Sequence, residues 1–371
     1  MGEIDVNGTG KLGFGLMRLP RKGLSIDIEQ TSRMVDLFME AGMTYFDTAF
    51  IYPGSEAATK LALVDRYPRE SYTLATKLFA SMVPTEKMAK GELETSLKRT
   101  GAGYFDYYLL HALQANNYRK YEKYHLWDFV KEEKARGRIR HIGFSFHDSP
   151  ELLDEILTDH PEAEFVQLQI NYADWENPGI QSRGVYEVAR KHGKPVIVME
   201  PVKGGTLAKP LKEVQSLFDE ANPNASYASW AIRFAASLDG ILTVLSGMSN
   251  VAQMEDNLSY MKDFSPLSDE ELRVIQKAET IYGASKTIPC TACRYCTTEC
   301  PKHIDIPTVL AAVNKRQTGG QIEAAATDYA ASAKNGGKAS DCIKCRRCET
   351  TCPQHITITE ELEKAVGLFE K

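Results

Sequence analysis

Short apolar runs alternate with longer segments of helical periodicity between residues 11 and 261 of the 371-residue chain. A short apolar run bounded by turn residues predicts a buried strand, whereas apolar residues every three or four positions predict an amphipathic helix. Regular alternation of the two predicts a parallel sheet with helices on its outside. The strand candidates are the stretches around Phe14, TYFDTAF, YTLATKL, FDYYLLH, IRHIGFS, FVQLQIN, PVIVMEP and ILTVLSG.

Most of these strands are followed by a polar turn and an amphipathic stretch, such as residues 86–99 and 126–136. Ser149 and Pro150 predict the N-cap and first residue of a further helix. Eight strand–helix units favour a closed (β/α)8 TIM barrel, because an open dinucleotide-binding sheet usually carries a Gly-rich fingerprint after its first strand. The G-x-G-x-x-G of this chain, Gly8 to Gly13, precedes the first strand and predicts a turn-rich segment instead.

The region after the barrel predicts a small, mostly helical second domain. A helix over residues 269–282 leads into a cysteine-containing region, which places a boundary near Gly283 and divides the chain into residues 1–282 and 283–371. The long spacer between Cys300 and Cys342 is Ala-rich and helical in pattern, except at the breaks TGG and NGG.

The composition describes a globular protein with a sizeable core, since 43% of residues are hydrophobic and 25% are charged. A formal net charge of -6 argues against nucleic acid as a partner, because binding phosphates requires a face rich in Lys and Arg. We find no signal peptide pattern and no apolar run of 18 residues, so we expect no membrane span and a cytoplasmic location.

All eight cysteines lie in two runs of the form C-x2-C-x2-C-x3-C-P, which begin at Cys290 and Cys342. In this pattern three thiolates on one tight loop face one [4Fe-4S] cluster and the fourth crosses to the other cluster. Two structural zinc sites are the alternative, although they usually show separated pairs of cysteines. The tail resembles the bacterial two-cluster ferredoxins. The expected ligands are Cys290, Cys293, Cys296 and Cys352 for cluster one, and Cys342, Cys345, Cys348 and Cys300 for cluster two.

Four polar residues fall at or just beyond the ends of three neighbouring strands: Asp47, Tyr52, Lys77 and His111. Active sites of TIM barrels lie at this carboxyl face of the sheet. A cation beside a phenol stabilises the phenolate, so we expect Lys77 to lower the pKa of Tyr52 and Asp47 to orient Lys77.

This arrangement resembles the catalytic tetrad of the aldo-keto reductases, and the resemblance covers about residues 10–262. It implies a barrel that binds NADP or NAD in extended form without a Rossmann domain. It also implies reduction of a small aldehyde or ketone, or the reverse oxidation of an alcohol. Tyr52 would protonate the carbonyl oxygen, and His111 would donate a hydrogen bond to the same atom.

The resemblance also implies a set of dinucleotide contacts. Many family members stack an aromatic ring on the nicotinamide where this chain has Met199, and the usual Asn after Ser145 is Phe146 here. Members that prefer NADP often carry Arg where Gln253 stands, so the choice between NADP and NAD stays open. The implied contacts are Ser145 and Gln169 at the carboxamide, Met199 at the ring, Pro201 and Lys203 near the phosphates, and Gly247, Ser249, Gln253 and Asn257 at the adenosine end.

The sequence leaves the task of the clusters open, because a hydride carries two electrons whereas one cubane cluster accepts one. The clusters could exchange electrons with an external one-electron redox partner or an unrecognised flavin, or they could form a structural or oxygen-sensing module. The alternative function is an iron-sulfur electron-transfer or redox-sensing protein in which the barrel is only a scaffold. Nothing in the sequence fixes an oligomeric state.

Overall fold

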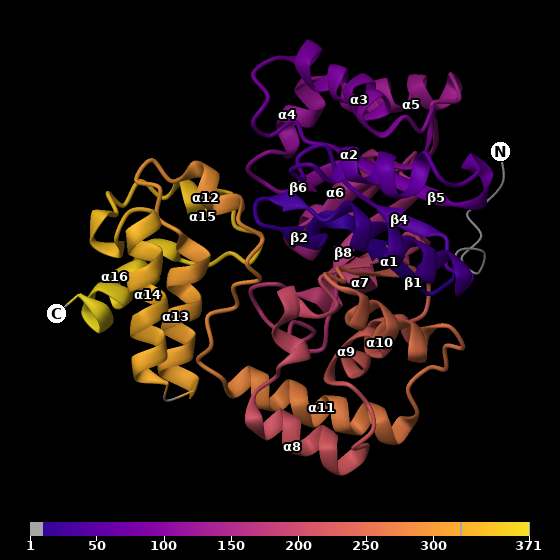
Figure 1. Ribbon diagram of the computed structural model, residues 1–371. Helices are drawn as coiled ribbons and strands as arrows, with labels where there is room; N and C mark the ends of the chain where they lie inside the picture. The colour runs from indigo at the N-terminus through magenta and orange to yellow at the C-terminus, as the bar shows by residue number, and fades with distance from the viewer. Residues whose placement is uncertain (1–9, 320, 371) are drawn as a thin grey trace.

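The computed structural model describes residues 10–319 and 321–370, and its centre is a closed barrel of eight parallel strands (Figure 1). The strands follow one another around the barrel in the order β1, β4, β5, β6, β7, β8, β9, β10, and β10 pairs with β1. All eight predicted strands are present, which confirms the barrel; Gly8 and Thr9 of the glycine motif lie outside the described residues. The strands are β1 (Leu12–Gly15), β4 (Tyr45–Asp47), β5 (Thr73–Leu78), β6 (Phe105–Leu113), β7 (Ile139–Phe146), β8 (Phe165–Gln169), β9 (Val196–Met199) and β10 (Ile241–Ser246).

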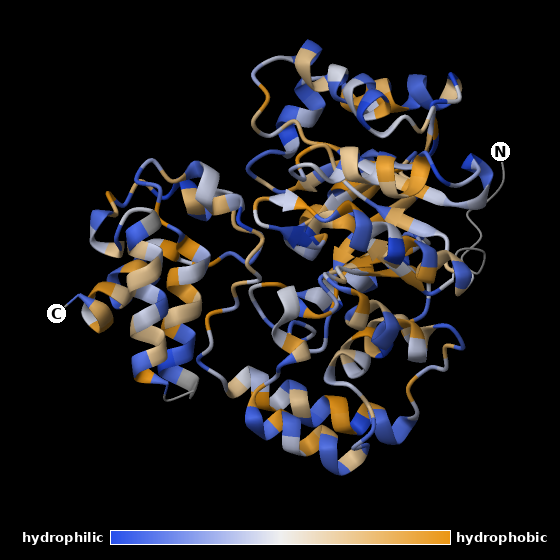
Figure 2. Ribbon diagram, in the orientation of Figure 1, coloured by the Kyte–Doolittle hydropathy of each residue, from blue (hydrophilic) through white to orange (hydrophobic). Residues whose placement is uncertain are grey.

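Helices surround the barrel, and the most hydrophobic ribbon lies on the strands inside them (Figure 2). The helices predicted over residues 86–99 and 126–136 are present to within a residue. The Ser149 side chain accepts a hydrogen bond from the Leu152 amide, and Pro150 opens the helix, as predicted. The helices are α1 (Ile28–Glu40), α2 (Ser55–Thr59), α3 (Glu86–Thr100), α4 (Tyr118–Lys123), α5 (Leu126–Ala135), α6 (Pro150–Asp159), α7 (Ser182–Lys191), α8 (Lys212–Ala221), α9 (Tyr227–Ala236), α10 (Val251–Met261) and α11 (Asp269–Ala284).

Two short antiparallel strands, β2 (Arg21–Lys22) and β3 (Ser25–Ile26), form a hairpin that the sequence pattern did not predict. Each strand has only two residues, and most of the hairpin is exposed. Its sequence therefore contains no alternation of apolar and polar residues from which a strand could be predicted. None of the helices in the described part of the chain is long and apolar enough to cross a membrane.

The C-terminal region packs beside the barrel around a hydrophobic core of its own, which includes Ile304, Val309 and Leu362 (Figure 1). It is mostly helical, as predicted, and the NGG break marks a close contact between backbones. A side chain at Gly336 would place its Cβ 2.3 Å from the His303 carbonyl oxygen. The helices are α12 (Tyr295–Glu299), α13 (Ile306–Gly319), α14 (Ile322–Asn335), α15 (Arg347–Thr350) and α16 (Ile358–Phe369).

Candidate active site

A cavity of about 900 Å³ lies at the carboxyl ends of the barrel strands. Asp47, Met199 and Ser246, which end β4, β9 and β10, line its barrel side. The C-terminal region forms the opposite wall of the cavity. The residues of this region that line the cavity are Thr291, Cys293, Tyr295, Pro353 and Gln354. The cavity is therefore shared between the barrel and the two cysteine runs.

Asp47 and Lys77 form a buried ion pair at the base of this cavity. The Lys77 ammonium donates to the Asp47 carboxylate and, at 2.8 Å, to the Thr48 carbonyl oxygen. The other Asp47 oxygen accepts from the Gln167 amide at 3.3 Å. Burial raises the pKa of Asp47 and lowers the pKa of Lys77, while their mutual attraction opposes both shifts. Asp47 therefore holds Lys77 in place, as the sequence predicted.

Tyr52 lies above the pair, with its ring centroid 5.3 Å from the Lys77 ammonium. Burial raises the pKa of Tyr52 well above its usual value, and the neighbouring Tyr295 phenol and the Asp47 carboxylate raise this pKa further. The predicted lowering of the Tyr52 pKa is thus wrong. The reason is geometric, because the Lys77 ammonium donates to Asp47 and Thr48 rather than to the phenol oxygen.

His111 supplies a neutral ring beside Tyr52, with the two ring centroids 5.9 Å apart. Burial, followed by the positive charge of Lys77, lowers the pKa of His111 well below its usual value. Its Nδ1 has no hydrogen-bond partner among the described residues, although the ring is only 3% exposed. The His111 side chain lines the cavity, so its ring can meet a ligand oxygen there.

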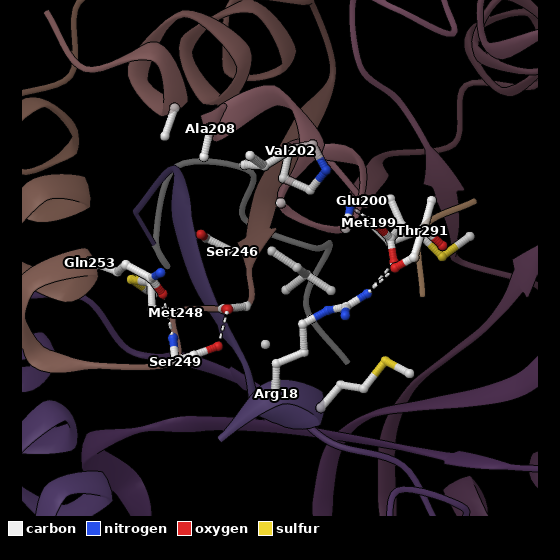
Figure 3. Close-up of a pocket in the computed structure, with 18 of the residues that line it drawn as sticks. Arg18, Met199, Glu200, Val202, Ala208, Ser246, Met248, Ser249, Gln253 and Thr291 are labelled. Atoms are coloured by element: carbon white, nitrogen blue, oxygen red, sulfur yellow. Dashed lines mark hydrogen bonds and ion pairs between the residues drawn. The ribbon is translucent and has the colours of Figure 1, made fainter. Parts of the chain in front are cut away.

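Seven of the nine implied dinucleotide contacts line the cavity. They are Gln169, Met199, Pro201, Gly247, Ser249, Gln253 and Asn257. The last four surround the start of α10, where the Asn250 side chain caps the helix and the Gln253 side chain accepts from the Ser249 amide at 2.7 Å (Figure 3). A helix N-terminus favours negative charge, so this end of the cavity suits phosphate groups.

Ser145 and Lys203 do not line the cavity. The β6–β7 register shifts after Leu110, and the Ser145 hydroxyl accepts from the Ala112 amide at 2.7 Å. Lys203 forms an ion pair with the fully buried Asp174 and faces a different hollow. An unpaired buried carboxylate is costly, which explains why Lys203 turns toward Asp174 and away from the phosphates' expected position.

The sequence reasoning missed the residues that the cysteine runs contribute. Tyr295, between Cys293 and Cys296, lines the cavity with Tyr52, and its phenol raises the pKa of Tyr52. Gln354 exchanges two hydrogen bonds with Gln169, at 3.1 and 2.7 Å. The only sign of Tyr295 and Gln354 in the sequence was that they lie close to cysteines. Hydrophobic periodicity cannot show that the loops carrying these two residues cover the mouth of the barrel.

A small clamp holds the first cysteine run against the barrel (Figure 3). The Arg18 guanidinium donates to the Thr291 carbonyl oxygen at 2.9 Å and pairs with the Glu200 carboxylate at 3.4 Å. The other Glu200 oxygen accepts from the Gly204 amide at 2.6 Å. Gly204 has φ +65°, and a Cβ there would lie 2.3 Å from the Thr291 oxygen, so only glycine permits this approach.

The eight cysteines surround two separate small hollows. None forms a disulfide. Among the described residues, no group of three His, Cys, Asp or Glu side chains is arranged to hold a single metal ion. Four thiols around a hollow suit a cubane cluster better than one zinc ion. Cys290, Cys293, Cys296 and Cys352 line one hollow, and Cys300, Cys342, Cys345 and Cys348 line the other.

Comparison with known proteins gives two family matches. The model of the aldo/keto reductase family matches residues 11–280, and that of a 4Fe-4S dicluster domain matches residues 289–357. The 9,11-endoperoxide prostaglandin H2 reductase of Trypanosoma cruzi (strain CL Brener) is 26% identical over 265 residues, which span 70% of this chain and 88% of that protein. An aldo-keto reductase of Mycobacterium avium (strain 104) is 27% identical over 267 residues, which span 71% and 84%.

Solved structures show the same likeness. The holo form of an aldo-keto reductase from Bacillus halodurans is 25% identical with a TM-score of 0.60, covering 73% of this chain and 94% of that one. An aldo/keto reductase from Klebsiella pneumoniae in complex with NADP and acetate shares the fold at 21% identity and a TM-score of 0.60, covering 74% and 92%. The chain therefore belongs to the aldo/keto reductase family, with a 4Fe-4S dicluster domain after its barrel.

Proposed function

We propose that the protein is an NAD(P)H-dependent carbonyl reductase that reduces a small aldehyde or ketone, or oxidises the corresponding alcohol. The observation that carries this proposal is the position of Tyr52 and His111 on one cavity, above the buried pair of Asp47 and Lys77. A general acid, a hydrogen-bond donor and a buried cation beside the acid are the groups that carbonyl reduction requires.

When bound, the dinucleotide supplies the hydride for the carbonyl carbon. Tyr52 donates a proton to the carbonyl oxygen, and its raised pKa keeps it protonated until that moment. Neutral His111 donates a hydrogen bond to the same oxygen. Lys77, 5.3 Å from the Tyr52 ring, stabilises the phenolate that proton transfer leaves behind.

The dinucleotide would lie with its phosphates near the start of α10 and its nicotinamide toward Met199 and Tyr52. The NADP complex of the Klebsiella pneumoniae relative supports this class of cofactor. Gln253 and Ser249 are neutral groups that can bind either a 2'-hydroxyl or a 2'-phosphate, so we propose NADP or NAD. The Gln169 amide nitrogen donates to Asp174 and Gln354, and its carbonyl oxygen already accepts from Gln354, so the second lone pair of that oxygen is what remains to accept from the nicotinamide amide.

We further propose that residues 283–371 hold two [4Fe-4S] clusters, about eight irons per chain, on the two sets of four cysteines. Burial raises the pKa of the Cys293 and Cys348 thiols to about 12, so bound iron is what keeps them as thiolates at neutral pH. No flavin motif is visible in the sequence, and we therefore assign these clusters to one-electron exchange with an external carrier. The confinement of all eight cysteines to the two runs, unlike the spread of cysteines in a secreted disulfide protein, supports a cytoplasmic location.

The test is the oxidation of NADPH and NADH with a panel of small aldehydes and ketones, comparing wild type with Tyr52→Phe. We expect kcat to fall by about 10²-fold or more, with dinucleotide affinity nearly unchanged. Tyr45→Phe is the matched control, because the Tyr45 hydroxyl is buried inside the barrel, away from the cavity, with no partner among the described residues. Turnover of Tyr52→Phe at the wild-type rate would remove Tyr52 from the proposed role.

A further inference from the structure

We propose that the surface around the second cysteine run is the docking site for an acidic protein that carries one electron. This surface, the cluster-two face, consists of Lys302 and residues 343–347. The proposal rests on the two clusters proposed above. It adds where the electron carrier binds and that this carrier is negatively charged.

Exposure distinguishes the two cysteine sets. Of the eight cysteines, all of which the structure describes, Cys345 alone is exposed. Its neighbour Ile343 is 58% exposed, so the loop around Cys345 presents an apolar side chain to solvent. In the other set, Cys293 lines the large cavity of the barrel, and Cys296 and Cys352 are buried. The first set therefore faces the reaction site, and the second set is the one that a protein in solution can approach.

The cluster-two face is basic on a chain with a net charge of -6. Lys302 and Arg346 line the same hollow as the second cysteine set, together with one carboxylate, that of Glu299. Lys344 pairs with Glu363 at 3.0 Å, and Arg346 lies 3.9 Å from Glu349, which compensates part of the charge. Lys302 and Arg347 are exposed and form no ion pair within the described chain.

This arrangement fits an acidic protein better than other polyanions. An apolar side chain surrounded by exposed charges matches the small interfaces of transient electron-transfer complexes, in which complementary charges steer the encounter. Four cations with three nearby carboxylates are a small patch for the dense charge of nucleic acid. Cys300, Cys342, Cys345 and Cys348 would hold the [4Fe-4S] cluster that accepts one electron from the reduced carrier, so that the carrier would be oxidised and the cluster reduced by one electron with no bond formed or broken.

The experiment uses the full iron-loaded protein and a reduced flavodoxin as the acidic carrier, mixed without oxygen in a stopped-flow spectrometer. The affinity of oxidised flavodoxin is measured separately by calorimetry, as a readout independent of electron transfer. The variant Arg346→Glu/Arg347→Glu reverses two charges of the face. A second variant, Lys302→Glu, reverses a charge outside the cysteine run in case the first variant loses iron.

The control is Lys98→Glu/Lys262→Glu, which changes the net charge by the same amount as the double variant. Both lysines are exposed, at or just beyond the C-terminal ends of α3 and α10. Helices of this barrel run opposite to its strands, so these lysines lie at the end of the barrel away from the cavity.

We expect Arg346→Glu/Arg347→Glu to lower the bimolecular rate about 10-fold at low salt and to weaken binding, with a smaller effect at high salt. Reduction by dithionite and the iron content should not change, and the control should behave like wild type. Equal rates and affinities in wild type and both face variants would overturn the docking site, as would wild-type binding to anionic lipid vesicles in preference to flavodoxin. A wild type without iron would instead overturn the clusters on which the proposal rests.

Discussion

Replacing Lys77 by Met tests the buried pair on which the proposed chemistry depends. Met has a similar length, so the change removes charge and hydrogen bonds without leaving a large cavity. The Lys77 side chain is 1% exposed and that of Asp47 is 4% exposed, so solvent cannot replace the lost partner. Asp47 would keep only the Gln167 amide at 3.3 Å. Breaking a buried pair from one side typically costs about 3–5 kcal/mol, and we expect a loss of this size in the free energy of unfolding.

The pH dependence of this loss has a definite sign. Burial already raises the pKa of Asp47 above its usual value, and removing the cation raises it further. A carboxyl group with a raised pKa in the folded state favours folding at low pH and loses this contribution as the pH rises through the folded-state pKa. The Lys77→Met deficit should therefore be large near neutral pH and shrink under acidic conditions, where Asp47 binds a proton.

The assay is urea unfolding of the iron-loaded protein followed by tryptophan fluorescence at several pH values. Lys98→Met is the control, since Lys98 is exposed, and Asp47→Asn/Lys77→Met should recover part of the lost stability by removing the unpaired charge. A Lys77→Met deficit below about 1 kcal/mol, or one equal to that of the double variant, would refute the reasoning.

Three further predictions concern other residues of the chain. Tyr295→Phe removes the phenol oxygen that raises the pKa of Tyr52, so the basic limb of the kcat profile against pH should move to lower pH; an unchanged profile would separate Tyr295 from the proton donor. Burial raises the pKa of Glu92 to about 8, so its contribution to stability should be lost as the pH rises through about 8, and unfolding of Glu92→Gln should lack that step. Gly204→Ala should loosen the first cysteine run, because its Cβ would meet the Thr291 oxygen at 2.3 Å; faster proteolysis within residues 285–295 checks this, and wild-type resistance would contradict it.

The sequence predicted what depends on local pattern. Strand periodicity gave the eight strands, and strand ends gave Asp47, Lys77 and His111, because parallel strands bring their carboxyl ends to one face. The spacing within each cysteine run also predicted which four cysteines line each hollow, since the crossing of the fourth cysteine is a property of a tight loop.

Contacts between distant segments were not predictable in this way. Lys203 is drawn to Asp174 and Ser145 to the Ala112 amide, and neither partner is adjacent in the sequence. The pKa of Tyr52 depends on burial under the C-terminal region and on Tyr295, which lies more than two hundred residues away along the chain. The local pattern of apolar and polar residues does not indicate which distant segments pack against each other.

The central claim is that both electrons reach the carbonyl together, as a hydride from the nicotinamide, while Tyr52 supplies the proton. The most direct measurement uses dinucleotide carrying deuterium at both positions of nicotinamide C4, a carbonyl substrate found in the panel, and mass spectrometry of the alcohol product. The account predicts one deuterium on the former carbonyl carbon in every product molecule of the wild type, and almost no product with Tyr52→Phe in the same time. Product that carries hydrogen from the solvent at that carbon would contradict the account, because the electrons would then have travelled separately from the hydrogen.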